Sequence, residues 1–207
     1  MLWLLITSII VIDLVLAEFR KERGLVAIFK PLASTCFVII AIDSGALRTT
    51  HGYIILAGLV FSWLGDVFLI SKERRWFFAG LLSFLLAHLA YIVAFFFRGI
   101  ELSYFFAVLP GLLVAAALVY RWIEPKLDGL DKPVVLYMTM ISTMVAAAVG
   151  NLHNMAGPGL AAGACFFFLS DVCVARERFV ESSFINKAIG LPAYYLGQVL
   201  IAMCGVL

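Results

Sequence analysis

Long apolar runs dominate this chain, and short charged segments separate them. Eight such runs can be marked out, at residues 2–17, 31–47, 51–70, 77–97, 102–122, 133–153, 157–175 and 188–206. At about 1.5 Å per residue, a helix of this length approaches or crosses a hydrocarbon core of about 30 Å. Backbone polar groups cannot bond to water in lipid, and the runs are too continuously apolar for barrel strands. The pattern therefore predicts an all-α polytopic membrane protein, with residues 1–207 forming a single domain of eight transmembrane helices.

Composition agrees with this interpretation. Of the 207 residues, 64% are hydrophobic and 14% are charged, far from the usual composition of soluble domains. The net charge of +2 is too small to indicate nucleic-acid binding. The first run lacks a basic start and is followed by positive charges, so we expect a retained helix and no cleaved signal peptide.

The Lys and Arg residues lie mostly in alternate connections between the predicted helices. Of the 15, only Arg48 and Arg98 fall outside the first, third, fifth and seventh connections. Basic residues concentrate on the cytoplasmic side of membrane proteins. We therefore expect these connections in the cytoplasm and both termini on the non-cytoplasmic side, in a bacterial cytoplasmic (inner) membrane. The basic residues of the four connections are Arg20, Lys21, Arg23, Lys30, Lys72, Arg74, Arg75, Arg121, Lys126, Lys132, Arg176, Arg178 and Lys187.

One phrase recurs in three of the predicted hairpins. Asp13 in "IDLVLAEFRKER", Asp66 in "GDVFLISKERR" and Asp171 in "SDVCVARERF" each precede apolar residues and a charged connection, at spacings of 53 and 105 residues. The spacings are close to one and two units of a common period. The missing unit falls near Val119, where no acid stands. A second echo pairs "FKPLASTC" at 29–36 with "DKPVVLYM" at 131–138. The repeat favours four inward-facing helical hairpins.

Two of these acids lie inside apolar runs at matched depth. Asp66 precedes Lys72 by six residues, about 9 Å along a helix, and Asp171 precedes Arg176 by five, about 7.5 Å. Ionisable residues inside a membrane are costly and usually face a bundle interior or a wet cavity. Each acid could instead pair with a basic residue of the next connection, which is the interpretation we favour for Asp13. The matched depth of the other two favours a shared site.

Polar side chains on the following helices point to the same region. His88 and Tyr91 share one face of a helix, and Tyr195 and Gln198 share one face of another. Each could equally be a packing residue, an inter-helix hydrogen-bonding residue or an interface anchor, and only the combination favours a site.

Two carboxyls facing a partly dry cavity suit acid–base chemistry. Burial favours the neutral form, and mutual repulsion can leave one carboxyl protonated while its partner is ionised. A zinc hydrolase is disfavoured, because His51 and His153 fall near the far side and only His88 lies deep. The four cysteines have no CxxC spacing either. We expect no metal and no cofactor.

These residues resemble the YhhN family of integral membrane proteins, which includes the animal lysoplasmalogenases. The resemblance covers most of the chain and is carried by "FKPL" at 29–32, "FSWLGDVFLI" and "FFAGLLSFLLAHLAYI" within 61–92, "FFFLSDVCVARERF" at 166–179 and "LPAYYLGQVLIA" at 191–202. It implies an eight-helix enzyme that hydrolyses the vinyl ether bond of lysoplasmalogens to a fatty aldehyde and a glycerophospho-base. The family's two essential aspartates match Asp66 and Asp171, and Asp13 and Lys30 fit positions to which we assign a supporting role.

The vinyl ether suggests roles for the candidate residues. One aspartate would protonate the carbon β to oxygen, and the other, ionised, would steady the oxocarbenium ion and activate water. We slightly favour Asp171 as the acid, and the exchanged roles stay open. The lysophospholipid chain would extend into the apolar centre of the bundle. The groups expected to orient water and the carboxyls are His88, Tyr91, Tyr195 and Gln198, and those expected to hold the phosphate are Arg74, Arg75, Arg176 or Arg178.

Two other functions fit parts of the pattern. Repeated hairpins with membrane acids also describe transporters of protons or small solutes, although a carrier site is expected nearer the midplane than these acids. A scaffold whose acids merely anchor arginines would keep any activity when both acids are lost. The sequence leaves the headgroup preference and the oligomeric state open.

Overall fold

The computed structural model describes residues 2–127 and 129–206 and confirms the prediction of an all-helical membrane protein. Within these residues, eight helices are long and apolar enough to cross a membrane. They are α1 (Leu2–Arg20), α2 (Arg23–Asp43), α3 (Thr50–Phe68), α4 (Arg74–Phe97), α5 (Leu102–Ile123), α6 (Asp131–Gly150), α7 (Gly157–Ala175) and α8 (Phe184–Cys204).

Three short helical elements lie in or next to the connections. Two are 3₁₀ turns, η1 (Ala46–Arg48) and η2 (Glu124–Lys126). The third, η3 (Arg176–Val180), is a π-helical turn that continues α7 beyond its last α-helical residue. Such turns are rare and frequently occur at functional sites.

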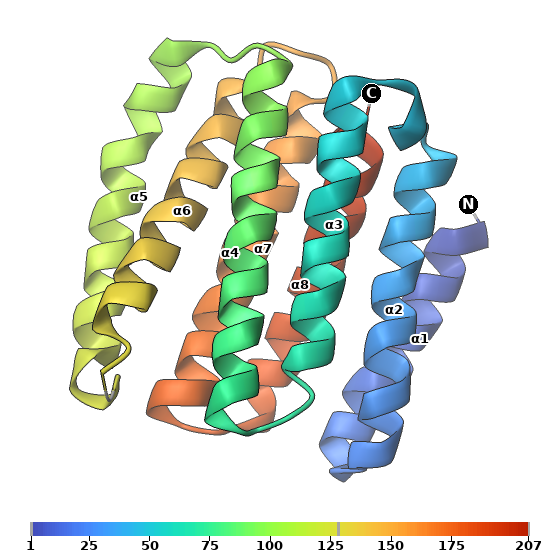
Figure 1. Cartoon of the computed structure of the whole chain (residues 1–207), viewed down its shortest axis with the longest axis vertical. Coiled ribbons are helices and arrows are strands. Elements are labelled where there is room, and N and C mark those ends of the chain that lie inside the picture. Colours follow the sequence, from blue (N-terminus) through green and yellow to red (C-terminus); the bar gives the residue numbers. More distant parts are fainter. Residues whose placement is uncertain (1, 128, 207) are drawn as a thin grey trace.

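The helices run up and down in sequence, so both described ends of the chain lie toward the same end of the bundle (Figure 1). Each of the pairs α1 and α2, α3 and α4, α5 and α6, and α7 and α8 packs side by side. The two halves of the bundle, α1 to α4 and α5 to α8, are joined where α4 packs against α6 and where α8 packs against α2. Helices α1 and α5 flank the bundle. A derivation of the bundle from four repeated hairpins stays a prediction.

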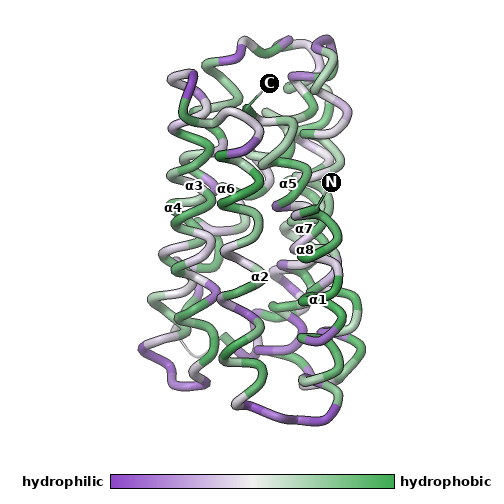
Figure 2. Tube along the Cα trace, turned by 90° about the vertical axis from the view of Figure 1, so that its right-hand side faces the viewer, coloured by the Kyte–Doolittle hydropathy of each residue, from purple (hydrophilic) through white to green (hydrophobic). Residues whose placement is uncertain are grey.

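The outside of the bundle is largely apolar. The hydropathy colouring is mostly green along the helices, and purple gathers toward the two ends (Figure 2). Large apolar side chains such as Phe106, Val114 and Leu118 on α5 are exposed. Such a surface is stable in contact with lipid and not with water, as expected for a multi-pass membrane protein. Inside, small residues allow close approach: a Cβ added at Gly197 of α8 would lie 2.8 Å from the carbonyl oxygen of Gly163 of α7.

Some helices start earlier than the apolar runs predict. The second helix begins at Arg23 instead of residue 31, and the eighth begins at Phe184 instead of residue 188. Lys30, which the sequence places in a connection, therefore lies inside α2, with a side chain only 12% exposed. A hydrophobic window misses such a turn, because a helix continues through charged residues where one of its faces is buried.

Candidate active site

One cavity of about 1010 Å³ contains both candidate aspartates. It lies at the end of the bundle that carries the α1–α2, α3–α4, α5–α6 and α7–α8 connections, which we call the basic end. Its mouth includes Lys21 and the connection at 70–73, and its inner walls include Asp66 on α3 and Asp171 on α7. The structure therefore brings together two acids that are 105 residues apart in the chain.

Asp66 is buried and surrounded by donors. Its Oδ2 accepts hydrogen bonds from Ser34 Oγ and Tyr194 Oη, each at 2.6 Å. Lys30 Nζ lies 3.4 Å from its Oδ1. A carboxylate with two hydroxyl donors and one ammonium group has compensation for its negative charge, as buried charges require. Lys30, which the sequence assigned a supporting role, thus contacts this acid directly.

The two helices that supply these donors are tied to each other. Tyr195 Oη donates to the Lys30 carbonyl oxygen at 3.1 Å and lies 3.3 Å from Ser34 Oγ. Tyr195 is almost fully buried and does not line the cavity. It connects α8 to α2 behind Asp66, while its neighbour Tyr194 reaches the carboxyl itself.

Asp171 has a different environment. Its Oδ2 accepts one hydrogen bond, from Tyr137 Oη at 2.8 Å, and its side chain is 18% exposed. Among the described residues, no Lys or Arg makes an ion pair with it. Asp171 thus has a neutral donor on one oxygen and an open approach from the cavity, whereas Asp66 has a cation.

His88 lies beside Asp171 without bonding to it. Its Nε2 is 3.7 Å from Asp171 Oδ2, longer than a hydrogen bond, and neither ring nitrogen has a partner within the described residues. The ring is fully buried and packs edge-on against Tyr137 and at a tilt against Phe167. His88 therefore supports the tyrosine that donates to Asp171.

The two acids have related surroundings. Each accepts from the helix before its own: Ser34 of α2 for Asp66, and Tyr137 of α6 for Asp171. Each is also approached from the other half of the bundle, by Tyr194 of α8 and by His88 of α4 respectively. The two halves differ in one lysine. Lys30 lies beside Asp66, whereas Lys132, at the same position of the similar phrase at 131–138, is exposed and lies outside this cavity.

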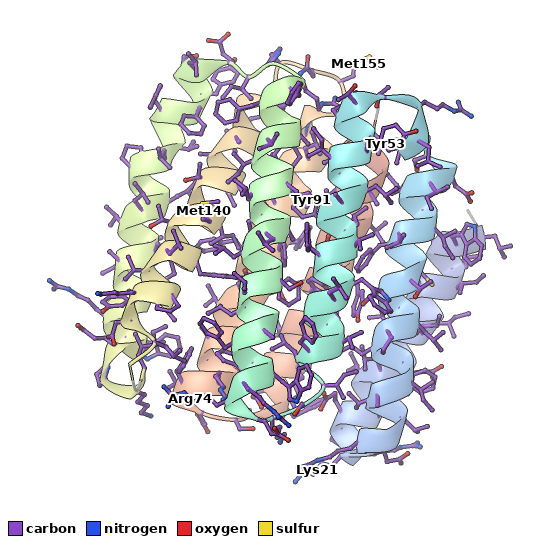
Figure 3. The ribbon with its side chains drawn as sticks, in the orientation of Figure 1. Lys21, Tyr53, Arg74, Tyr91, Met140 and Met155 are labelled. Carbon is purple, nitrogen blue, oxygen red and sulfur yellow. The ribbon has the colours of Figure 1, made fainter. Side chains whose placement is uncertain are left out.

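Tyr91 and Gln198 belong to a separate polar cluster. Tyr91 Oη donates to Gln198 Oε1 at 2.8 Å, and Gln198 Nε2 donates to Ser62 Oγ at 3.1 Å. Neither residue lines the cavity, and Tyr91 lies near mid-height of the bundle, far above the labelled Arg74 (Figure 3). The cluster satisfies its own polar groups and joins α3, α4 and α8.

Of the four arginines expected to hold the phosphate, only Arg178 lines the cavity among the described residues. Arg74 and Arg176 are not among the described residues that line the cavity, and Arg176 bonds to Asn186 and Glu181. Lys72 and Arg178 do line it. The Arg178 guanidinium donates to the Lys72 carbonyl oxygen and lies 4.4 Å from the centre of the Phe77 ring.

Asp13 stands apart from both acids. It is partly buried on α1 and does not line the cavity. Another α1 acid, Glu18, does line it and forms an ion pair with Lys187 of α8 at 2.6 Å.

Sequence reasoning missed three donors: Ser34, Tyr137 and Tyr194. Ser34 and Tyr137 lie within the echoed phrases at 29–36 and 131–138, so the repeat contained a signal for both. The dipeptide at 194–195 offered two tyrosines, and the i, i+3 rule selected Tyr195, which shares a helix face with Gln198 but bonds to the Lys30 carbonyl oxygen. The rotation of α8 against α3 decides which tyrosine reaches Asp66.

Comparisons with known proteins agree with the sequence motifs. Residues 25–204 match the YhhN family, which confirms the resemblance. Similar proteins include lysoplasmalogenase TMEM86A of Homo sapiens, 35% identical over 73% of this chain and 65% of that protein. They also include a lysoplasmalogenase of Mycobacterium bovis, 31% identical over 68% of this chain and 54% of that protein. The uncharacterized membrane protein YhhN of Escherichia coli O157:H7 is 29% identical over 89% of both chains. This chain thus matches about 65% of the length of the TMEM86A proteins. No solved structure matches it.

Proposed function

Because this chain belongs to the YhhN family, we propose that it is a lysoplasmalogenase-like hydrolase. Its substrates would be 1-alkenyl glycerophosphoethanolamines and glycerophosphocholines without a second chain, and its products a fatty aldehyde and a glycerophospho-base. The names of several relatives support this activity. The observation that carries the proposal is one cavity whose inner walls hold two aspartates, of which, among the described residues, Asp66 has a cation as partner and Asp171 has none.

A vinyl ether needs a proton on carbon before water can attack. Protonation of the carbon β to the ether oxygen is the slow step in water, and it leaves an oxocarbenium ion. A general acid positioned at that carbon lowers this barrier, and a nearby negative charge stabilises the cation. The reaction needs two carboxyls in opposite protonation states.

The contacts favour Asp171 as the acid. Its Oδ2 accepts from Tyr137, so Oδ1 can hold the proton that the cavity-bound vinyl group receives. After the transfer, Tyr137 remains in place to stabilise the new carboxylate. His88 acts through its packing against Tyr137 and is a positioning residue.

The contacts favour Asp66 as the base. Lys30, Ser34 and Tyr194 hold it as a carboxylate. It takes a proton from the water that adds to the oxocarbenium carbon, and the resulting hemiacetal breaks into aldehyde and glycerophospho-base. Asp66 then releases this proton to water, and Asp171 takes one up, so each turnover consumes one water and returns both acids to their starting states.

The mouth of the cavity suits a zwitterionic headgroup. Lys72 and Arg178 provide positive charge for the phosphate, and Arg178 is one of the arginines expected from the sequence. Glu18 and Glu177, both on the cavity wall, have Lys187 as a common ion-pair partner and together with it leave one negative charge for an ammonium group. We assign the headgroup to this basic end.

Aldehyde release tests the proposal. Purified protein is incubated with lysoplasmalogen, and the aldehyde is trapped by reduction as it forms. We expect aldehyde from the intact protein and none from a variant that carries Asp66→Asn and Asp171→Asn together. Absence of aldehyde from folded protein with both choline and ethanolamine substrates would refute the activity and favour a different lipid or the transporter.

A further inference from the structure

The cavity has an apolar arm that the acid–base chemistry does not use. The lining residues of this arm come from α4, α5 and α6. We call this arm the side branch, and its walls are Leu81 of α4, Ala116, Val119 and Ile123 of α5, and Met138 and Ile141 of α6.

The side branch cannot continue along the bundle axis. The uppermost residues of the whole cavity on α4 and α6, Phe84 and Ile141, lie ten residues from the starts of their helices, or about 15 Å along each axis. Above them the centre is filled, because Leu59, Tyr91 and Phe95 have no exposed surface and do not line the cavity. The cavity thus reaches about half the depth of a hydrocarbon core of ~30 Å.

Helices α4 and α5 separate where the side branch lies. They are linked at residues 98–101, and Phe96 contacts Phe105 near that link, with ring centres 5.8 Å apart. From there the two helices diverge toward the basic end (Figure 1). Farther down, α5 packs against α6 and η3 and makes little contact with α4.

The turn η3 closes the lower edge of this separation. Phe179 of η3 contacts Phe77 of α4, with ring centres 5.8 Å apart, and also packs against the cluster of Ile123, Leu127 and Val134. Lys126 Nζ donates to the Val180 carbonyl oxygen at 3.0 Å and ties η2 to the same turn. Any sideways opening is therefore framed above by Phe96 and Phe105 and below by η3.

Helix α5 has a divided surface that fits this arrangement. Phe105, Ala116 and Ile123 are its only described buried residues. Ala116 faces the side branch and is 6% exposed, whereas its neighbour Ala117 is exposed on the outer face. Because α5 has few core contacts, its inner face serves mainly as a wall of the cavity.

We propose that the hydrocarbon chain of a lysophospholipid lies in the side branch and passes between α4 and α5 into the bilayer. The occupant is a single alkyl or alkenyl chain, because the arm is apolar, joins the cavity beside Asp171 and is too short to enclose a long chain. This inference rests on the proposed function and deepens it. It places the chain at the side of the bundle and not in the apolar centre that the sequence suggested.

A pair of alanine variants tests the side branch. Ala116→Phe puts a large ring into the arm, whereas Ala117→Phe makes the same change on the outer face of the same helix. In phosphatidylcholine nanodiscs, we expect Ala116→Phe to lower kcat/KM for a long-chain lysoplasmalogen at least tenfold and for a short-chain one much less. Ala117→Phe should stay within about twofold of the parent. Equal effects on both chain lengths, or from both variants, would contradict the proposal.

Photolabelling gives a readout that does not need turnover. The probe is a lysophosphatidylcholine with a diazirine in mid-chain, which has no vinyl ether. We expect labels on Leu81, Ala116, Val119 and Ile123 that excess unlabelled lysolipid removes, and at least fivefold less labelling in Ala116→Phe than in Ala117→Phe. Labels at Leu59 or Tyr91, or none that compete, would overturn the inference. Competable labels on α5 without aldehyde release would refute only the reaction, and aldehyde release with labels elsewhere would refute only the chain site.

Discussion

The ammonium nitrogen of Lys30 lies 3.4 Å from a carboxyl oxygen of Asp66, and the two side chains are 12% and 3% exposed. Removing a carboxylate from water is costly unless a positive charge and hydrogen-bond donors replace the solvent. Lys30, Ser34 and Tyr194 supply both for Asp66, while Asp171 has one neutral donor. The pairing thus distinguishes two acids whose roles the sequence left open to exchange.

Replacing either acid by its amide should remove activity. Asp66→Asn and Asp171→Asn keep the size of the side chain but cannot exchange a proton, so we expect turnover to fall about 10²- to 10⁴-fold. Asp13→Asn is the matched control and should be much milder, because Asp13 lies outside the cavity. Turnover is measured on protein that remains monodisperse in detergent. A central variant that kept more than about a tenth of the rate would have lost less than ~1.4 kcal/mol of barrier and could not have lost the proposed acid or base.

Removing Lys30 should leave the buried Asp66 carboxylate without a positive partner. Lys30→Met leaves Asp66 without its cation, so we expect the free energy of unfolding to fall by about 3 kcal/mol and activity to be lost. Lys30→Met combined with Asp66→Asn restores neutrality and should recover most of the stability but no activity. Thermal unfolding in detergent measures the first effect and aldehyde release the second.

The comparison of the single and double variants of Lys30 and Asp66 can also contradict this account. If the double variant were as unstable as the sum of the single variants, Lys30 and Asp66 would not be coupled. The account of Asp66 as a carboxylate held by Lys30 would then fail.

Three tyrosines should differ in their effects on turnover. Tyr194→Phe removes a donor to Asp66, and Tyr137→Phe removes the donor to Asp171. A hydrogen bond to a charged group contributes about 1.5–3 kcal/mol, so each should lower kcat roughly tenfold to a hundredfold. Tyr91→Phe leaves Gln198 bonded to Ser62 and should lower stability by about 1 kcal/mol with little effect on kcat. A larger kcat loss in Tyr91→Phe than in Tyr194→Phe would support the residue chosen from sequence alone.

Turnover in isotopically labelled water should show which carbon receives the proton and which carbon receives the oxygen of water. If a carboxyl gives its proton to carbon in the slow step, turnover in deuterium oxide should be several-fold slower and place one deuterium beside the aldehyde carbon. Water enriched in ¹⁸O should label the aldehyde. Trapping by reduction prevents exchange, and unlabelled aldehyde carried through the procedure measures what remains. Finding the ¹⁸O in the glycerophospho-base would exclude the oxocarbenium route.

The basic end should face the cytoplasm. We expect a cysteine at Lys72 to resist an impermeant maleimide in intact cells, and a cysteine at Met155 to react, in a background without the four native cysteines. Met155 is exposed at the opposite end of the bundle (Figure 3), so it provides the matched control. The reverse pattern would invert the orientation.

The sequence predicts the spans and the pair of acids because both depend on local features. Eight apolar runs have only one solution in lipid, and the recurring phrase puts Asp66 and Asp171 at one depth. The same logic fails for Lys30, because a charge at the edge of an apolar run looks like the end of a helix. Its burial depends on α2 packing against α3 and α8.

The donors to the acids show a second limit. Periodicity identifies which residues of α8 share a face, but Tyr194 and Tyr195 differ by only about 100° around the helix. Whether one or the other reaches Asp66 depends on how α8 is rotated, which no local pattern records. For the basic residues, the connections predict positive charge at one end of the bundle, while the turn η3 decides that Arg178 and not Arg176 lines the cavity.

A cavity with a watery mouth and an apolar flank between α4 and α5 has a consequence for equilibrium. Under the proposed reaction, cleavage divides an amphiphile into a fragment that dissolves in water and one that dissolves in lipid. With the headgroup at the mouth and the chain at the side, each fragment would diffuse into its own phase without passing the other. Dilution of the two products into separate phases would oppose the reverse reaction and limit product inhibition, without any moving gate.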